Sequence, residues 1–156
     1  MPRLVLMCGM PGSGKTTRAR QLAASLPAVR LCPDEWMAGL GIDLFADSFR
    51  DQLERVMWQH AQELLTAGLS VVLESGHWLR SDRDEKRAWA RRAEIPVELH
   101  FLAVPLEERW QRLQRRNAVA GHGSVPLRRA QLEEYVTHFQ VPDAEELAHF
   151  NEPFDT

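Results

Sequence analysis

Eight residues near the start of the chain, Gly9-Met10-Pro11-Gly12-Ser13-Gly14-Lys15-Thr16, match G-x-x-x-x-G-K-[ST] at every fixed position. The glycines allow a tight turn whose successive N–H groups line a concave surface that favours an anion. Lys15 can reach the β- and γ-phosphates of a nucleotide, and the Thr16 hydroxyl suits Mg²⁺, which prefers oxygen ligands. We therefore predict that a nucleoside triphosphate binds here, with Thr16 as metal ligand, rather than that the stretch is an unliganded turn. The predicted nucleotide-binding residues are Gly9, Met10, Pro11, Gly12, Ser13, Gly14, Lys15, Thr16 and Thr17.

Two carboxylates come at the ends of other apolar segments. Asp34 follows the run 29–32, where a strand would end at the ligand-binding edge of a parallel sheet. A kinase needs a group that orients or deprotonates the acceptor hydroxyl, and Asp34 suits that role; the alternative is an N-cap for a short helix beginning at Glu35. Glu74 ends the apolar run 69–74 and could hold a metal-bound water, contact the acceptor or simply terminate a strand.

Four arginines gather in one segment, Arg109, Arg112, Arg115 and Arg116. The first, second and fourth share a helical face, because their spacing is i, i+3 and i+7. Arginine matches the equatorial oxygens of a phosphoryl group with paired donors, so we predict at least one catalytic arginine in this cluster. Arg112 and Arg116 are the predicted candidates, and the choice between them stays open. The alternative is a solvated basic face. The small-residue loop 118–124 would let this segment close as a lid over about residues 106–127.

The loop after residue 74 is the predicted acceptor pocket. We expect Glu74, His77, Trp78 and Arg83 to bind the acceptor, with Arg80 beside them. Trp36 would flank the same mouth and stack on a planar or sugar-like molecule together with Trp78. Each of these residues, taken alone, could equally be structural or solvated.

The elements that must position these residues alternate along the chain. Apolar runs predict strands at 3–8, 29–32, 69–74 and 97–104, and helical patterns occupy 16–26, 47–67, 81–93, 106–117 and 127–139. Such alternation predicts an α/β fold with a parallel, doubly wound sheet. In the last strand Glu98 and His100 alternate with apolar residues, which predicts a partly exposed face near a sheet edge.

Composition limits the class of protein. With 156 residues, 44% hydrophobic and 26% charged, the chain is expected to form one domain over residues 1–156. It shows no membrane-spanning run and no signal peptide, and Cys8 and Cys32 look like reduced core residues, so we expect a cytoplasmic protein. No Cys/His spacing suggests zinc. Residues 76–131 carry twelve basic and seven acidic residues, a basic part that suits an anionic ligand.

Taken together, these stretches resemble a group of small P-loop kinases. The resemblance is carried in order by Gly9–Thr16, Pro33-Asp34-Glu35-Trp36, Val71–Gly76, and Arg112–Asn117 followed by Val125-Pro126. The group includes the 5′-hydroxyl polynucleotide kinase domain, chloramphenicol phosphotransferase, zeta toxin and bacterial AAA-type ATP-binding proteins. It implies a P-loop NTPase three-layer α/β/α fold, core strand order 2-3-1-4, Mg²⁺-ATP as donor, Asp34 as catalytic base and Arg116 as a lid arginine.

Two features depart from the pattern of the group. Ala120 stands where polynucleotide kinase-like members tend to carry another basic lid residue, a charge that Arg112 or Arg115 would then supply. No clear fifth strand follows the lid, so either the sheet has four strands or residues 147–154 add an irregular edge.

The sequence therefore favours an ATP-dependent phosphotransferase acting on a hydroxyl of a small molecule. Its predicted catalytic residues are Lys15, Asp34, Arg112 and Arg116. A nucleic-acid 5′-hydroxyl kinase is an alternative, although a net charge of −3 without a long basic groove argues against it. The other alternative is an ATP-driven switch that releases no phosphorylated product. The acceptor and the choice between ATP and GTP stay open.

Overall fold

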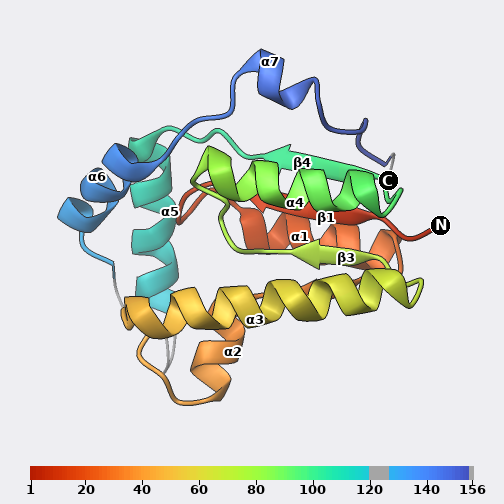
Figure 1. Ribbon diagram of the computed structural model, residues 1–156. Coiled ribbons are helices and arrows are strands. Elements are labelled where there is room, and N and C mark those ends of the chain that lie inside the picture. Colours follow the sequence, from red (N-terminus) through yellow and green to blue (C-terminus); the bar gives the residue numbers. More distant parts are fainter. Residues whose placement is uncertain (120–126, 155–156) are drawn as a thin grey trace.

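A parallel sheet lies between two layers of helices in the computed structural model, which describes residues 1–119 and 127–154 (Figure 1). The elements in chain order are β1 (Leu4–Cys8), α1 (Lys15–Ser25), β2 (Val29–Leu31), α2 (Pro33–Gly39), α3 (Asp47–Thr66), β3 (Val71–Leu73), α4 (Arg80–Arg92), β4 (Val97–Phe101), α5 (Leu106–Val119), α6 (Arg129–His138) and α7 (Ala144–Leu147). α3 and α4 cover one face of the sheet and α1 the other. The predicted three-layer α/β/α class is confirmed.

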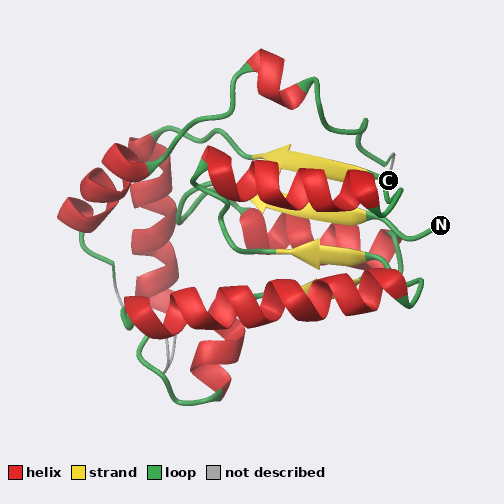
Figure 2. Ribbon diagram, in the orientation of Figure 1, coloured by secondary structure: helices red, strands yellow, loops and turns green. Residues whose placement is uncertain are grey.

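The strand order is β2-β3-β1-β4, as the family resemblance implied. All pairings are parallel, and Leu4 of β1 lies opposite Val71 of β3 on one side and Val97 of β4 on the other. The strands therefore run in one direction, and their carboxyl ends meet at one edge of the sheet (Figure 2). Ligands bind outside that edge in open α/β sheets, so loops after β1, β2 and β3 are placed to form a site.

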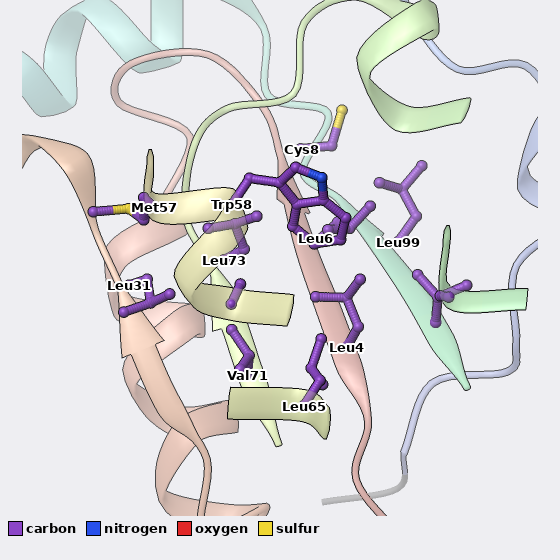
Figure 3. Close-up of a cluster of buried hydrophobic side chains, with 13 residues drawn as sticks. Leu4, Leu6, Cys8, Leu31, Met57, Trp58, Leu65, Val71, Leu73 and Leu99 are labelled. Atoms are coloured by element: carbon purple, nitrogen blue, oxygen red, sulfur yellow. The ribbon is translucent and has the colours of Figure 1, made fainter. Parts of the chain in front are cut away.

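The core is split between the two faces of the sheet. Leu4, Leu6 and Cys8 of β1 pack with side chains of α3 and α4 (Figure 3), whereas Val5 and Met7 pack against α1. All five side chains are fully buried. Because successive strand residues point to opposite faces, an apolar strand such as β1 is stable only with helices on both sides.

Helix α3 packs on the sheet through the buried side chains of Met57, Ala61 and Leu65, whereas Val56 is 58% exposed. The four-residue spacing of the buried side chains makes one continuous row along the helix. The adjoining row at the beginning of α3 is polar and faces the loops at the carboxyl edge of the sheet.

Strand β4 is an edge strand, as predicted, but its polar residues are not exposed. Glu98 is fully buried and accepts hydrogen bonds from Arg3 Nε (2.7 Å) and from His100, whose Nε2 lies 2.8 Å away. The C-terminal segment covers this edge: the Asn151 N–H donates to the Val97 carbonyl, and the Val97 N–H donates to the Asn151 side chain. The prediction of an exposed face is therefore wrong, because these side-chain partners and the C-terminal segment cover the polar residues of β4.

The remaining expectations concern the ends of the chain and the lid. Among the described residues the sheet has four strands, and the bonding at Asn151 supplies the irregular edge considered for residues 147–154. Residues 120–126 of the predicted lid, with Ala120 and the Val125-Pro126 pair, lie outside the described residues. Within the described ranges, no helix is both long and apolar enough to cross a membrane.

Candidate active site

The loop between β1 and α1 has the geometry of a phosphate cradle. Gly12 and Gly14 have φ angles of +80° and +91°, and a Cβ on Gly12 would lie 2.8 Å from the Arg109 carbonyl oxygen. Only glycine adopts this backbone at low cost and allows so close an approach. Gly14 caps α1 without a side-chain hydrogen bond. Within residues 1–119 and 127–154, no backbone carbonyl accepts from the N–H groups of Lys15, Thr16 or Thr17. These donors at a helix N-terminus fit an anionic ligand.

Lys15 is held at the mouth of this cradle. Its Nζ donates to the Gly9 carbonyl at 2.8 Å. Burial lowers the pKa of Lys15, and the nearby charges of Asp34 and Glu74 oppose that shift. A buried ammonium that faces two carboxylates and a set of free N–H groups is positioned to gain a strong interaction from a phosphate.

Thr16 and Glu74 form the second part of the phosphate end. The Thr16 hydroxyl donates to a Glu74 carboxylate oxygen, and Arg30 Nη1 donates to the other oxygen at 2.6 Å. Glu74 is only 7% exposed. Because the hydroxyl proton of Thr16 goes to Glu74, the lone pairs of its oxygen are free for a metal ion. Of the roles considered for Glu74, this arrangement supports the one at a metal site.

Asp34 lies in the first turn of α2, just past β2. The N-cap of that helix is Cys32, so the alternative role of Asp34 as an N-cap is wrong. Its carboxylate, 62% exposed, accepts from Arg50 Nη1 at 2.6 Å, and Arg50 Nη2 donates to the Leu44 carbonyl at 2.9 Å. The arginine therefore fixes Asp34 by tying it to the loop before α3.

The arginines of α5 have separate functions in the structure. Arg109 is 4% exposed and donates to the Val104 carbonyl at 3.0 Å; burial lowers its pKa, and it supports the glycine-rich loop from behind. Arg112 and Arg116 line the cavity, and a Cβ on Gly14 would lie 3.7 Å from Arg112 Nη1. Arg112 also pairs with Glu108 at 2.8 Å. Arg115 does not contribute to the cavity wall.

One cavity of about 980 Å³ joins these groups. It runs from Met10–Thr17 past Asp34 and Glu74 to the side chains of α3 and α6. Gly9 lies outside the lining, and its carbonyl accepts from both Lys15 and the Trp78 indole N–H (3.2 Å). The size fits a nucleotide and a small second ligand.

Of the residues expected to bind the acceptor, the structure places Glu74, His77 and Trp78 at the cavity and Arg83 away from it. Arg83 is fully buried, pairs with Glu146 (Nε–Oε1 2.6 Å) and also donates to the carbonyls of His77 and Gln140. Its acceptor-binding role is therefore wrong, because every nitrogen of its guanidinium already has a protein partner. Trp36 and Arg80 also lie outside the cavity lining.

Several cavity residues were missed from the sequence. Three carboxylates of α3, Asp47, Asp51 and Glu54, share one helical face at i, i+4 and i+7, a spacing that the sequence did display. Arg50 comes from the same turn. Asp82, Glu134, Tyr135 and His138 also line the cavity and come from α4 and α6. No local signal marks these four, since only the packing of the helices brings them to the site.

Known proteins share this fold and, in part, this sequence. The Protein KTI12 homolog of Bos taurus is 32% identical over 108 residues, which make up 65% of this chain and 30% of that relative. The matched stretch thus spans less than a third of the relative's length.

Three solved structures resemble the chain at 22% identity, which establishes likeness of fold. A chain of the Pnkp1/Rnl/Hen1 RNA repair complex has a TM-score of 0.71 and is matched over 96% of this chain and 46% of that one. A sugar kinase from Janibacter sp. HTCC2649 has a TM-score of 0.66, and the match covers 94% of this chain and 82% of that one. Kti12 of Chaetomium thermophilum, in complex with ADP-AlF3, has a TM-score of 0.68, and the match covers 91% of this chain and 82% of that one.

The family model described as an AAA domain matches residues 4–142. This match includes the glycine-rich loop, all four strands and α1 to α6. The chain therefore belongs to the AAA domain family, and it shares its fold with the sugar kinase and with Kti12.

Proposed function

We propose that the protein is an ATP-dependent phosphotransferase that moves the γ-phosphoryl group of ATP to a hydroxyl of a small molecule. One observation carries the proposal: Asp34 and the phosphate cradle line the same cavity, and space remains beyond Asp34 for a second ligand. This layout would bring the terminal phosphorus and an acceptor oxygen together, which is most of what such a reaction requires. The sugar kinase that shares the fold supports the same class of reaction.

The phosphate end would bind the triphosphate through main-chain N–H groups at the start of α1 and through Lys15. Charge develops on the equatorial oxygens of the transferred group, so Arg112 and Arg116 would stabilise the transition state from the α5 side. We assign residues 106–127 as the lid that carries both arginines, in a single domain over residues 1–156.

The residues present fit a magnesium ion bound together with the nucleotide. Thr16 would be its protein ligand, with Glu74 accepting from that hydroxyl. Within the described ranges, no cluster of three or more His, Cys, Asp or Glu side chains has metal-binding geometry, so the other ligands would be phosphate oxygens and water. When bound, Mg²⁺ supplies charge neutralisation on the β- and γ-phosphates.

Asp34 would orient the acceptor hydroxyl and take its proton. Arg50 holds the carboxylate in place through an ion pair, with 2.6 Å between Arg50 Nη1 and Asp34 Oδ1. An ionised carboxylate in this position can accept the proton. The Asp34–Arg50 pair thus serves positioning, while the adjacent cradle supplies electrostatic stabilisation.

The test is Asp34→Asn, which keeps the shape of the side chain and removes the base. We expect Mg²⁺-ATP binding within about twofold of the parent and transfer lower by about 10²–10³-fold, the usual range for loss of a general base. ATP affinity is measured by calorimetry and transfer by mass analysis of a product heavier by one phosphoryl group. Glu85→Gln is the control, because Glu85 is an exposed carboxylate on α4 away from the cavity.

Two other results would redirect the assignment. ATP hydrolysis that no acceptor stimulates would favour a nucleotide-driven switch. Preferred phosphorylation of an oligonucleotide 5′-hydroxyl would favour a nucleic-acid kinase, a reaction class suggested by the likeness to a chain of the RNA repair complex. Near-normal transfer by Asp34→Asn would show that Asp34 is not the base.

A further inference from the structure

The far end of the cavity is lined by carboxylates. We call Asp47, Asp51, Glu54, Asp82 and Glu134 the acidic wall, because all five line the cavity beyond Asp34. They come from three helices, α3, α4 and α6. This end therefore differs in charge from the phosphate end, where Lys15 and the α5 arginines gather.

Few cations balance the acidic wall. The basic side chains that act on Glu54 are Arg50, which is paired with Asp34, and Lys86, which is paired with Asp82. His138 also lines the cavity. In the parts of the chain that the structure describes, no basic side chain comes within salt-bridge distance of Asp47, Asp51 or Glu54. A bound cation would supply the missing charge.

Glu54 shows the consequence of this imbalance. Burial raises the pKa of Glu54 to about 7; Arg50 and Lys86 lower it, and Asp82 and Asp51 raise it further. A carboxyl group with this environment gains much from a positive ligand, because the ligand offsets both the desolvation and the repulsion.

A second, independent observation is an unpartnered nitrogen on His77, a residue that lines the cavity. His77 lines the cavity and is 1% exposed, and its Nδ1–H donates to the Met7 carbonyl at 2.7 Å. Nε2, on the opposite side of the ring from that bond, has no hydrogen-bond partner among the described residues. Burial lowers the pKa of His77 to about 4, so at neutral pH Nε2 is an acceptor that lacks a donor.

Two aromatic rings complete this end of the cavity. Trp78 and Tyr135 both line it, with ring centroids 5.1 Å apart and planes inclined by 50°. Aromatic faces attract cations and also pack against the C–H face of a sugar or cyclitol ring. The far end thus offers hydrogen-bond acceptors, negative charge and π surface.

We propose that the acceptor is a polyhydroxylated small molecule with at least one protonated amine, and that the acidic wall binds this amine while Asp34 receives the reacting hydroxyl. The inference rests on the proposed phosphotransferase function and names its substrate class. Hydroxyls and ammonium groups are the donors that carboxylates and His77 Nε2 lack. An anionic acceptor, such as a sugar acid or an oligonucleotide end, would be repelled by the same wall.

In the reaction the acceptor oxygen bonds to the γ-phosphorus, and the bond between that phosphorus and the β,γ-bridging oxygen breaks. The electron pair leaves with ADP. The hydroxyl proton passes to the Asp34 carboxylate and then to solvent. The amine stays protonated against the acidic wall and takes no part in bond making.

The test compares acceptors that share a ring and differ in charge: glucosamine, glucose and glucuronate, and likewise 2-deoxystreptamine and myo-inositol, with a 5′-hydroxyl oligonucleotide as an anionic macromolecule. Phosphorylated products are detected by mass, and KM is measured for each acceptor at fixed Mg²⁺-ATP. We expect the amine-bearing member of a set to have a KM about tenfold lower than its neutral partner. The difference should shrink at high salt.

The double variant Asp51→Asn/Glu54→Gln replaces two carboxyl groups of the acidic wall with neutral amides. It should bring the KM ratio of amine to neutral acceptor to within about twofold of one. A purely structural role of these two residues would change the KM of both acceptors alike. Glu63→Gln is the matched control, since Glu63 lies on α3 with its side chain 78% exposed, outside the cavity lining.

The outcomes separate this inference from the proposed function. Transfer that favours neutral or anionic acceptors overturns the inference alone and leaves the phosphotransferase standing. An unchanged KM ratio in the double variant also overturns it. If no acceptor of any charge is phosphorylated, the proposed function fails, and this inference fails with it.

Discussion

The two ends of the cavity are built in different ways. At the phosphate end, consecutive residues 10–17 supply main-chain N–H groups, the Lys15 ammonium and the Thr16 hydroxyl. At the acceptor end, the surface consists of side chains from α3, the β3–α4 connection, α4 and α6. The first depends on local backbone geometry, and the second depends on how helices distant in sequence pack together.

Under the proposed function, this difference would make the phosphate end general and the acceptor end specific. Main-chain donors bind any phosphate chain, and their positions require only two glycines with positive φ at the end of a strand. A side-chain surface can change its charge by single substitutions without disturbing the sheet. We therefore expect substitutions at the phosphate end to affect every acceptor alike and substitutions at the acceptor end to change selectivity.

The strongest test of this separation is Lys15→Ala. Removing the ammonium should lower transfer by about 10³-fold with every acceptor, because the charge acts on the nucleotide. ATP affinity should also fall. The measurements are ATP titration and product formation with two acceptors of different charge; the ratio between the two acceptors should not change. A change confined to one acceptor would contradict the comparison.

Much of the phosphate end could be predicted from the sequence. The motif Gly9–Thr16, the apolar strand before it and the helix after it are contiguous, so the local pattern contains the geometry. The carboxylates beside the loop could be predicted as well, because Asp34 and Glu74 come at the ends of strands that are parallel. The strand order itself came from family resemblance, because apolar runs alone do not say which strands pair.

The acceptor end was harder to predict because its residues have no local signature. Arg83 looks like any other arginine of the highly charged helix α4, yet it is fully buried because Glu146, 63 residues later, pairs with it. The carboxylates of α3 were visible at helical spacing, but which face of α3 meets the cavity depends on Met57 and its row packing on the sheet. Long-range packing thus explains both the wrong role predicted for Arg83 and the failure to predict the α3 carboxylates as cavity residues.

The second prediction concerns the support of the acceptor end. Arg83→Met should lower the free energy of unfolding by about 3 kcal/mol, because it leaves Glu146 buried without its partner. It should also raise the acceptor KM more than the ATP dissociation constant, since Arg83 holds the carbonyls of His77 and Trp78. Urea unfolding and steady-state kinetics measure the two effects.

Arg92→Met is the matched control for that experiment, because Arg92 lies on the same helix and is exposed. Equal destabilisation by Arg92→Met and Arg83→Met would show that the buried pair contributes nothing special. The double substitution Arg83→Met/Glu146→Leu should recover part of the loss, since neither charge then remains buried alone.

The third prediction uses the titration of Glu54. Its pKa is raised by burial to about 7, above the ordinary value of 4.5, so the folded state binds the proton more tightly than the unfolded state. This contribution to stability is complete below pH 4.5 and is lost as pH rises through 7. Glu54→Gln should therefore stabilise the protein by about 2 kcal/mol at pH 8 and by little at pH 4.5.

Urea unfolding at both pH values measures this difference, with Glu63→Gln as control because its side chain is 78% exposed. The same stabilisation at both pH values would mean that packing, not charge, is responsible. No stabilisation at pH 8 would mean that the acidic wall carries no electrostatic strain without a ligand, which would weaken the contrast between the two ends.

The smallest expected effect tests whether the two ends are independent at all. Trp78 lines the acceptor end, but its indole N–H donates to the Gly9 carbonyl at 3.2 Å, and Lys15 Nζ donates to the same oxygen. Trp78→Phe keeps an aromatic ring beside Tyr135 and removes this one donor. Loss of a neutral hydrogen bond of this kind contributes about 1 kcal/mol, so ATP affinity should fall by about fivefold.

Tyr135→Phe is the control for that comparison, because it alters the same aromatic pair without touching the Gly9 carbonyl. Calorimetric titration with Mg²⁺-ATP should give parent affinity for Tyr135→Phe and weaker binding for Trp78→Phe. If both variants bind ATP as the parent does, the shared Gly9 carbonyl does not couple the two ends, and their binding free energies are independent. A fall in affinity only in Trp78→Phe would show that the acceptor end is coupled to Lys15 through a single main-chain oxygen, so that a ligand that moves Trp78 also changes how the phosphate end binds nucleotide.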